Sequence, residues 1–200
     1  MSQRILVVTW TMPPLVFPRS VQISRLLKGL AGLGWEIDVL TVHPEDVQGT
    51  SDPSFAALYE AYYTTHYVRI GEDVVTTPLA QRIKRRLNPP ANYSEYNFLR
   101  RGFDKVLQLA RKNEYSALVT FAQPWVDHML GLSVKKALPQ LPWLAHFSDP
   151  WADNPFDTGN EAAHFTALRD EASVIHAADA VAFVSQETSN LVMRKYNTQT

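Results

Sequence analysis

The 200-residue chain contains no cysteine, so disulfide bonds and thiolate metal sites are excluded. An excess of one charge is also absent, because the chain has 19 Lys and Arg residues and 20 Asp and Glu residues. This balance gives no argument for nucleic-acid binding. No apolar run approaches the roughly 18 residues that span a bilayer, and no cleavage pattern follows the apolar residues 5–8. These absences predict a cytoplasmic protein without a membrane-spanning segment.

Six short apolar segments have the composition of buried strands: residues 5–10, 37–42, 65–70, 117–121, 143–147 and 180–184. Most are continuous apolar runs, which are typical of a parallel sheet with helices on both faces. Between them lie segments whose apolar residues recur at helical spacing, as at Ile23, Leu27 and Leu30. Gly34 follows this first helical segment, as a C-cap glycine would. The sequence therefore predicts one doubly wound, Rossmann-like α/β domain over residues 1–200. We expect three layers (α/β/α) and the strand order 3-2-1-4-5-6.

Ligands of such sheets bind beyond the carboxyl ends of the strands, near the switch point between strands 1 and 4. This rule selects the loops that follow Trp10, Phe121 and Phe147. The first of these loops, residues 11–20, contains no glycine, whereas a dinucleotide fingerprint needs glycines there. A Gly-Lys-Ser/Thr phosphate loop is also missing from the chain. We therefore expect that this domain does not hold a nucleotide by itself.

Two polar side chains near the first and second of these loops are candidates for a binding site. Arg19 lies where the first helix opens, and free helix N–H groups together with a guanidinium attract anions. The alternative is a rigid proline-rich turn with Ser20 as the N-cap. Gln123 follows strand 4 and could reach into the cleft, or it could serve the turn.

The loop after strand 5 offers Asp149 and Trp151. Asp149 could hydrogen-bond an incoming hydroxyl, although Asp-Pro is also a common turn opener. Trp151 could stack on a sugar face or fill the loop. His146 is expected inside the strand in a packing role. The histidines show no metal-ligand spacing, so no metal site is predicted.

Residues 71–96 interrupt the alternation of strands and helices. Leu79, Ile83 and Leu87 recur at four-residue spacing, which indicates a short amphipathic helix. The basic residues interleaved with them are Arg82, Lys84, Arg85 and Arg86. This helix could lie against anionic lipid headgroups at the inner face of the plasma membrane, or it could be an ordinary solvated helix.

Several stretches in order along the chain resemble the retaining glycosyltransferases of family 4: residues 5–8 with Pro13-Pro14, then residues 25–41, 141–151 and 178–188. The resemblance implies the N-terminal, acceptor-side half of a two-domain GT-B enzyme. The C-terminal domain, which would bind the nucleotide sugar, is expected to be missing from this chain. The complete enzyme would be a hexosyltransferase that moves a sugar, with retention, to a hydroxyl of a sugar or lipid-linked glycan acceptor.

The same resemblance implies glycan or polysaccharide biosynthesis, with no metal and no cofactor besides the nucleotide-sugar co-substrate. It places Asp149 at the reaction centre and Arg19, Gln123 and Trp151 at the acceptor. The fragment alone is expected to be inactive. Phe17-Pro18 replace a Gly-Gly pair that is frequent in the family, so donor contact through backbone amides is not expected.

Two other functions stay open at this point. Rossmann-like sheets host many functions, so the domain could be a non-catalytic binding or regulatory module. It could also be half of a sugar-nucleotide epimerase, which shares the two-domain plan.

Overall fold

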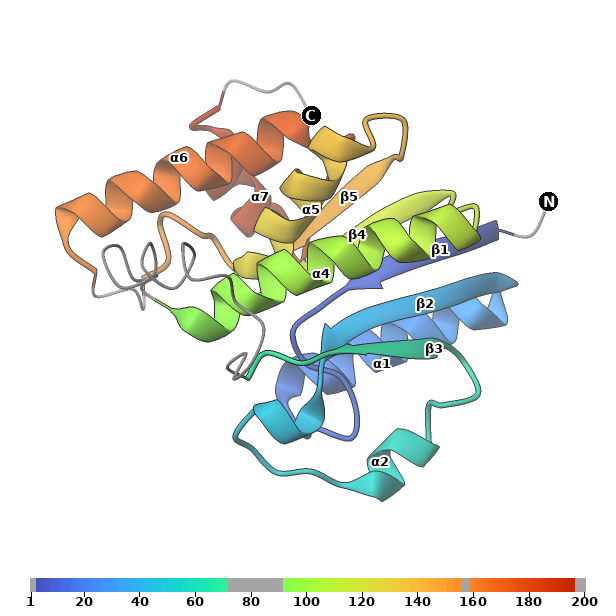
Figure 1. The fold of residues 1–200 in the computed structure, drawn as a ribbon. Coiled ribbons are helices and arrows are strands. Elements are labelled where there is room, and N and C mark those ends of the chain that lie inside the picture. Colours follow the sequence, from blue (N-terminus) through green and yellow to red (C-terminus); the bar gives the residue numbers. More distant parts are fainter. Residues whose placement is uncertain (1–2, 72–91, 156–158, 197–200) are drawn as a thin grey trace, which may run out of the picture.

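Six parallel strands form a single sheet in the order β3-β2-β1-β4-β5-β6 in the computed structural model, which describes residues 3–71, 92–155 and 159–196 (Figure 1). The strands are β1 (Gln3–Val8), β2 (Trp35–Val42), β3 (Thr64–Val68), β4 (Ala117–Ala122), β5 (Trp143–Phe147) and β6 (Ala180–Phe183). The predicted fold class and strand order are confirmed. The strands share one direction, so their carboxyl ends form one edge of the sheet, at the left in Figure 1.

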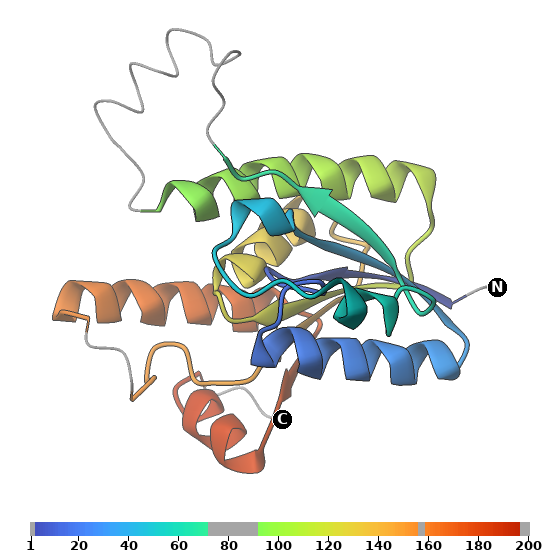
Figure 2. The ribbon, with the colours of Figure 1, turned by 90° about the horizontal axis from the view of Figure 1, so that it is seen from below.

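Helices cover both faces of the sheet, as Figure 2 shows for α1 and α4 on opposite sides. The longer helices are α1 (Pro18–Gly32), α4 (Tyr93–Lys112), α5 (Val126–Ala137), α6 (Glu161–Ala177) and α7 (Gln186–Met193). Two short helices, η1 (Pro44–Asp46) and α2 (Pro53–Ala57), lie in the connection from β2 to β3. Neither is predicted from the sequence, because both helices are too short for a periodic apolar pattern.

Each face of the sheet has its own apolar core. Phe98 of α4 and Leu130 of α5 are fully buried in one cluster, and Ile23 of α1 belongs to the other. Neighbouring residues of β4 divide between them, Leu118 into the first and Val119 into the second. Because successive strand residues point to opposite faces, burial of both faces requires the continuous apolar runs seen in the sequence.

Helix α1 begins earlier than the sequence suggested. Phe17 is the N-cap and Pro18 the first helical residue, where a proline ring already has the helical φ angle. Ser20 is therefore not the N-cap: it is fully buried inside the first turn, and its hydroxyl has no hydrogen-bond partner among the described residues. The end of the helix is as predicted, since Gly34 adopts a φ of 90° and donates its N–H to Ala31 at 3.0 Å.

A buried carboxylate joins three strands near their amino ends. Asp38 of β2 accepts hydrogen bonds from Arg4 Nε at 2.7 Å and from the Tyr115 hydroxyl at 2.8 Å, and its other oxygen lies 2.8 Å from His66 Nε2. Burial disfavours the charge on Asp38, but these three hydrogen bonds outweigh it and hold its pKa below the usual range. This network joins β1, β2 and β3, and both oxygens of Asp38 take part in it.

Candidate functional site

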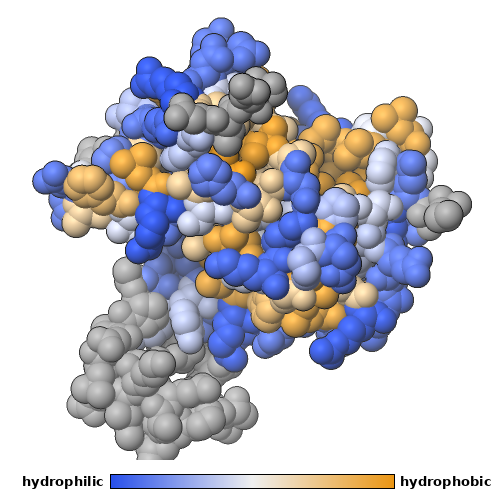
Figure 3. Space-filling model, turned by 90° about the horizontal axis from the view of Figure 1, so that it is seen from above, coloured by the Kyte–Doolittle hydropathy of each residue, from blue (hydrophilic) through white to orange (hydrophobic). Residues whose placement is uncertain are grey.

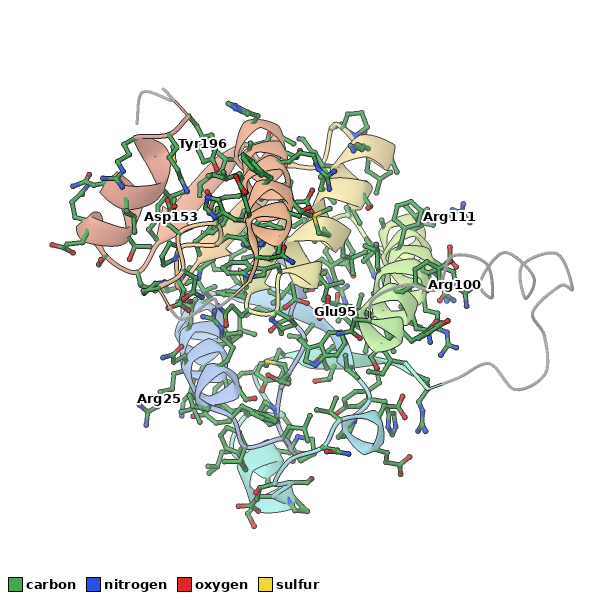
Figure 4. All side chains as sticks on the ribbon, turned by 90° about the vertical axis from the view of Figure 1, so that its left-hand side faces the viewer. Arg25, Glu95, Arg100, Arg111, Asp153 and Tyr196 are labelled. Carbon is green, nitrogen blue, oxygen red and sulfur yellow. The ribbon has the colours of Figure 1, made fainter. Side chains whose placement is uncertain are left out.

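A cleft of about 1200 Å³ opens at the carboxyl edge of the sheet. Its lining includes the connections β1–α1, β4–α5 and β5–α6, which are the three loops that the topology selected from sequence. The β2–β3 and β6–α7 connections and the starts of α1 and α4 complete it. Figure 4 looks onto this edge, with Glu95 of α4 near the middle of the view. Polar and aromatic residues of the lining include Trp10, Arg19, Glu95, Gln123, Trp125, Ser148 and Asp149.

Arg19 is the half-buried cation of this lining. It lies in the first turn of α1, which contains no acidic residue, and its guanidinium donates a hydrogen bond to the Ser148 hydroxyl. Burial lowers the pKa of Arg19, and the nearby charges of Asp149 and Asp127 offset part of that effect. Within the described ranges Arg19 forms no salt bridge, although a guanidinium carries five N–H donors. A cation with unused donors beside helix N–H groups is suited to an anionic ligand.

Gln123 and Asp149 lie at the mouth of the cleft. Both side chains are exposed and both line it, so the structure brings them together with Arg19 as the sequence predicted. Asp149 can therefore accept a hydrogen bond from a hydroxyl in the cleft without a rearrangement of the backbone. His146 lies within β5, half-buried, with its ring 5.0 Å from that of Phe121. Burial lowers the pKa of His146, which fits the packing role predicted for it.

Beneath the cleft lies Asp127, to which the sequence analysis assigned no role. It occupies the first turn of α5 and is fully buried. Its Oδ2 accepts a hydrogen bond from the Trp10 backbone N–H at 2.8 Å, whereas Oδ1 has no partner in the part of the chain that is described. Burial raises the pKa of Asp127 well above its ordinary value, against smaller opposite effects of the Trp10 hydrogen bond and the Arg19 charge. Burial therefore favours the neutral form of this carboxyl group, and its hydrogen bond to Trp10 ties the first loop to α5.

Trp151 does not face this cleft. Its side chain is buried and stacks on Trp125, with ring centroids 4.8 Å apart and planes at 6°. The backbone N–H groups of Trp151 and Ala152 donate to the buried Glu171 of α6 at 2.9 and 3.0 Å, which draws the loop down toward that helix. Trp151 fills the loop and lies outside the lining of the cleft, whereas Trp10 and Trp125 are the indoles that line it, and sugar contact by Trp151 stays a prediction.

The predicted basic helix, with Arg82, Lys84, Arg85 and Arg86, lies outside the described residues, so membrane contact stays a prediction. None of the helices that are described combines the length and the apolar composition needed to cross a bilayer. The described residues also contain no group of three His, Asp or Glu side chains placed to hold a metal ion.

Comparison with known proteins identifies the fold and not the family. No protein-family model matches the chain, and no curated protein matches it in sequence. Among solved structures, a putative UDP-N-acetylglucosamine 2-epimerase from Listeria monocytogenes covers 99% of the chain with a TM-score of 0.60 at 8% identity. UGT89C1 from Arabidopsis thaliana, complexed with UDP-L-rhamnose, covers 98% with a TM-score of 0.57 at 9% identity.

The chain spans less than half the length of these two neighbours, 43% of the first and 49% of the second. At such low identity the likeness shows the fold alone. The chain has the Rossmann-like architecture of one half of a GT-B fold.

Proposed function

We propose that the chain is the acceptor-binding half of a GT-B glycosyltransferase. The complete enzyme transfers a hexosyl group, with retention of configuration, from a nucleotide sugar to a hydroxyl of a sugar or lipid-linked glycan acceptor. The observation that carries the proposal is the convergence of Arg19, Gln123 and Asp149, from three separate loops, in one cleft at the switch point of a GT-B half. The resemblance of the sequence to family 4 supports the retaining outcome.

A second domain that carries the donor site is part of this proposal. The β1–α1 connection contains no glycine and two prolines, Pro13 and Pro14, and Pro18 opens α1, so its backbone is poorly suited to close approach around a nucleotide. The donor is therefore held from the far side of the open cleft, while this half presents the acceptor.

Each cleft residue has a distinct task in the proposed reaction. Asp149 accepts a hydrogen bond from the acceptor hydroxyl and holds it for attack on the face from which the nucleoside diphosphate departs. The Arg19 guanidinium stabilises the negative charge that develops on the diphosphate. Asp127 holds the Trp10 backbone, which positions the loop that leads to Arg19.

Half of a sugar-nucleotide epimerase is the second candidate. The fold match to the putative epimerase over 99% of the chain favours it. The proposed transferase yields a glycosylated acceptor and a nucleoside diphosphate, whereas an epimerase yields an altered nucleotide sugar without any acceptor. Product analysis on the protein encoded by the complete gene separates the two.

The role of Asp149 is tested in that complete protein. We expect Asp149→Ala to lower the rate of transfer about 100-fold, the range for one lost positioning contact, without a change in the circular dichroism spectrum. Asp104→Ala, at an exposed position of α4, is the matched control and should transfer at the normal rate. A normal rate in the Asp149 variant would assign this residue to the turn alone.

A further inference from the structure

A second groove lies next to the cleft, on the other side of Trp125. Its volume is about 440 Å³. One wall is the stacked pair Trp125 and Trp151, and the other wall is the first half of α6. The residues that α6 contributes are Ala162, Ala163, Thr166, Ala167 and Asp170. Because Trp125 lines both the cleft and the groove, a ligand that passes this indole can occupy both.

The tryptophan wall is held rigidly by a buried carboxylate. Glu171 Oε2 accepts the two backbone hydrogen bonds of the Trp151 loop, and Oε1 accepts hydrogen bonds from Lys195 Nζ at 2.6 Å and the Tyr196 hydroxyl at 2.5 Å. Lys195 also pairs with Asp153 at 2.7 Å, and Figure 4 shows Asp153 and Tyr196 on the same side of the molecule. The indole pair is thus preorganised, so a ligand need not order it on binding.

The helical wall is open to a ligand. The first half of α6 projects from the body of the protein, and residues 161–166 are all exposed (Figures 1 and 3). The space-filling view shows hydrophobic and hydrophilic side chains mixed at this end of the helix. The alanines leave the groove wide, while Thr166 and Asp170 supply polar groups. His164 Nδ1 lies 2.9 Å from the Ala152 carbonyl oxygen, which ties α6 to the loop.

The chemistry of the groove fits a sugar better than an alkyl chain. An aromatic face contacts the C–H face of a pyranose ring, and carboxylate and hydroxyl groups bind its hydroxyls. Asp170 Oδ1 already accepts a hydrogen bond from Arg169 at 3.0 Å, and a carboxylate has capacity for further donors. An alkyl chain would desolvate Asp170 and give it no donor in return.

We propose that the acceptor is an oligosaccharide whose reacting sugar occupies the cleft and whose next sugars cross Trp125 into the α6 groove. This inference rests on the proposed function and deepens it, because it assigns the acceptor a minimum length and gives Trp151 a part in binding. The groove then selects an acceptor chain over a free monosaccharide.

The test is the dependence of binding on ligand length. The probes are mono- to tetrasaccharides of glucose, mannose, galactose, N-acetylglucosamine and rhamnose, with octyl glucoside as the alkyl probe, titrated by saturation-transfer NMR. In the series that binds, we expect the trisaccharide to bind about tenfold more tightly than the monosaccharide, equivalent to ~1.4 kcal/mol. Tighter binding of octyl glucoside than of the trisaccharide would assign the groove to an alkyl chain and overturn the inference.

Two variants on α6 complete the test. Ala163→Arg fills the groove from an exposed helical position, so we expect it to remove the length dependence and leave monosaccharide binding unchanged. Ser173→Arg, exposed on the same helix away from the groove, should keep the length dependence. Equal affinity for saccharides of all lengths would overturn the assignment of the groove as a sugar-binding site. An Ala163→Arg variant that keeps the length dependence would do the same. Either result leaves the proposed function unaffected. Absence of binding by every sugar overturns the proposed function itself.

Discussion

Two buried aspartates at opposite ends of the sheet differ in what surrounds them. Asp38, near the amino ends of the strands, has three side-chain partners and a pKa below the ordinary range. Asp127, under the carboxyl edge, has a single backbone donor, one oxygen without a partner among the described residues, and a raised pKa. Both side chains are almost inaccessible to water, and burial raises the pKa of each. At Asp38 three side-chain hydrogen bonds outweigh burial, whereas at Asp127 the single backbone hydrogen bond does not.

The arginines at the two ends show the same contrast. Arg4 has its pKa raised, first by its hydrogen bond to Asp38, whereas burial is the first cause that lowers the pKa of Arg19. The amino end is thus a closed network that stabilises the fold. The carboxyl edge carries groups with unused bonding capacity, which is where a ligand gains most from binding.

The largest expected effect on stability is at Asp38, near the amino ends of the strands. Asp38→Ala leaves Arg4, His66 and Tyr115 without their common acceptor, and we expect it to lower the free energy of unfolding by about 3 kcal/mol. Urea unfolding of the variant and of Asp104→Ala gives the comparison, since the exposed Asp104 should change stability by less than about 0.5 kcal/mol. A loss below about 1 kcal/mol would show that the network contributes little to the fold.

Acid should weaken the carboxyl half through His128. This side chain is fully buried, and its pKa is lowered to about 3, first by burial and then by His146 and Arg19. The folded pKa lies below the unfolded one, so the stabilising effect is complete above pH ~6.5 and is lost as the pH falls toward 3. The expected slope is about 1.4 kcal/mol per pH unit.

The matched variants are His128→Asn, whose amide can replace Nδ1 in its 2.7 Å contact with the Thr120 hydroxyl, and the exposed His176→Asn. Unfolding free energies measured between pH 7 and pH 4 should fall less steeply for the first variant than for the second. Identical slopes would mean that other groups cause the acid sensitivity.

Replacing the carboxyl group of Asp127, at the carboxyl edge of the sheet, with an amide should make the protein more stable. Asp127→Asn keeps an acceptor for the Trp10 N–H, and we expect a gain of about 1 kcal/mol at pH 7. Because the pKa of Asp127 is higher in the folded state than in the unfolded state, Asp127 does not reduce the free energy of unfolding below the unfolded pKa. Above about pH 4 the reduction grows as the pH rises. The gain should therefore vanish near pH 4, and a variant less stable at both values would contradict this account.

The smallest effect on stability is expected at Arg19. Arg19→Ala should change the free energy of unfolding by less than about 0.5 kcal/mol, because only the Ser148 contact is lost. Transfer by the complete enzyme should nevertheless fall about 100-fold, since charge stabilisation on the diphosphate is removed. For Arg4→Ala we expect the opposite. The free energy of unfolding should fall, and the protein that remains folded should transfer at the normal rate. Equal effects of the two substitutions would remove the distinction between the two ends.

Local sequence signals predicted the fold well. The apolar segments of the sequence, most of them continuous, located every strand to within two residues, and Gly34 marked the end of α1. The rule for parallel sheets also brought Arg19 and Asp149 to one edge, because strand order alone fixes which loops meet.

What the sequence could not predict depends on contacts between distant residues. Asp127 is buried by its packing against Trp10, 117 positions away, and an aspartate in a first helical turn is usually an exposed cap. Trp151 is drawn from the cleft by Glu171, which looks like an ordinary polar position in the pattern of α6. Neither arrangement leaves a periodic signal.

Nucleotide-sugar binding by this chain alone tests the central claim most directly. UDP-glucose, GDP-mannose and dTDP-glucose are titrated into the 200-residue protein by isothermal calorimetry. We expect no saturable binding at millimolar ligand, because the glycine-free β1–α1 connection is poorly suited to close approach around a nucleotide. Saturation with a micromolar dissociation constant, lost on substitution of Arg19, would show that this half holds the donor and would contradict the account.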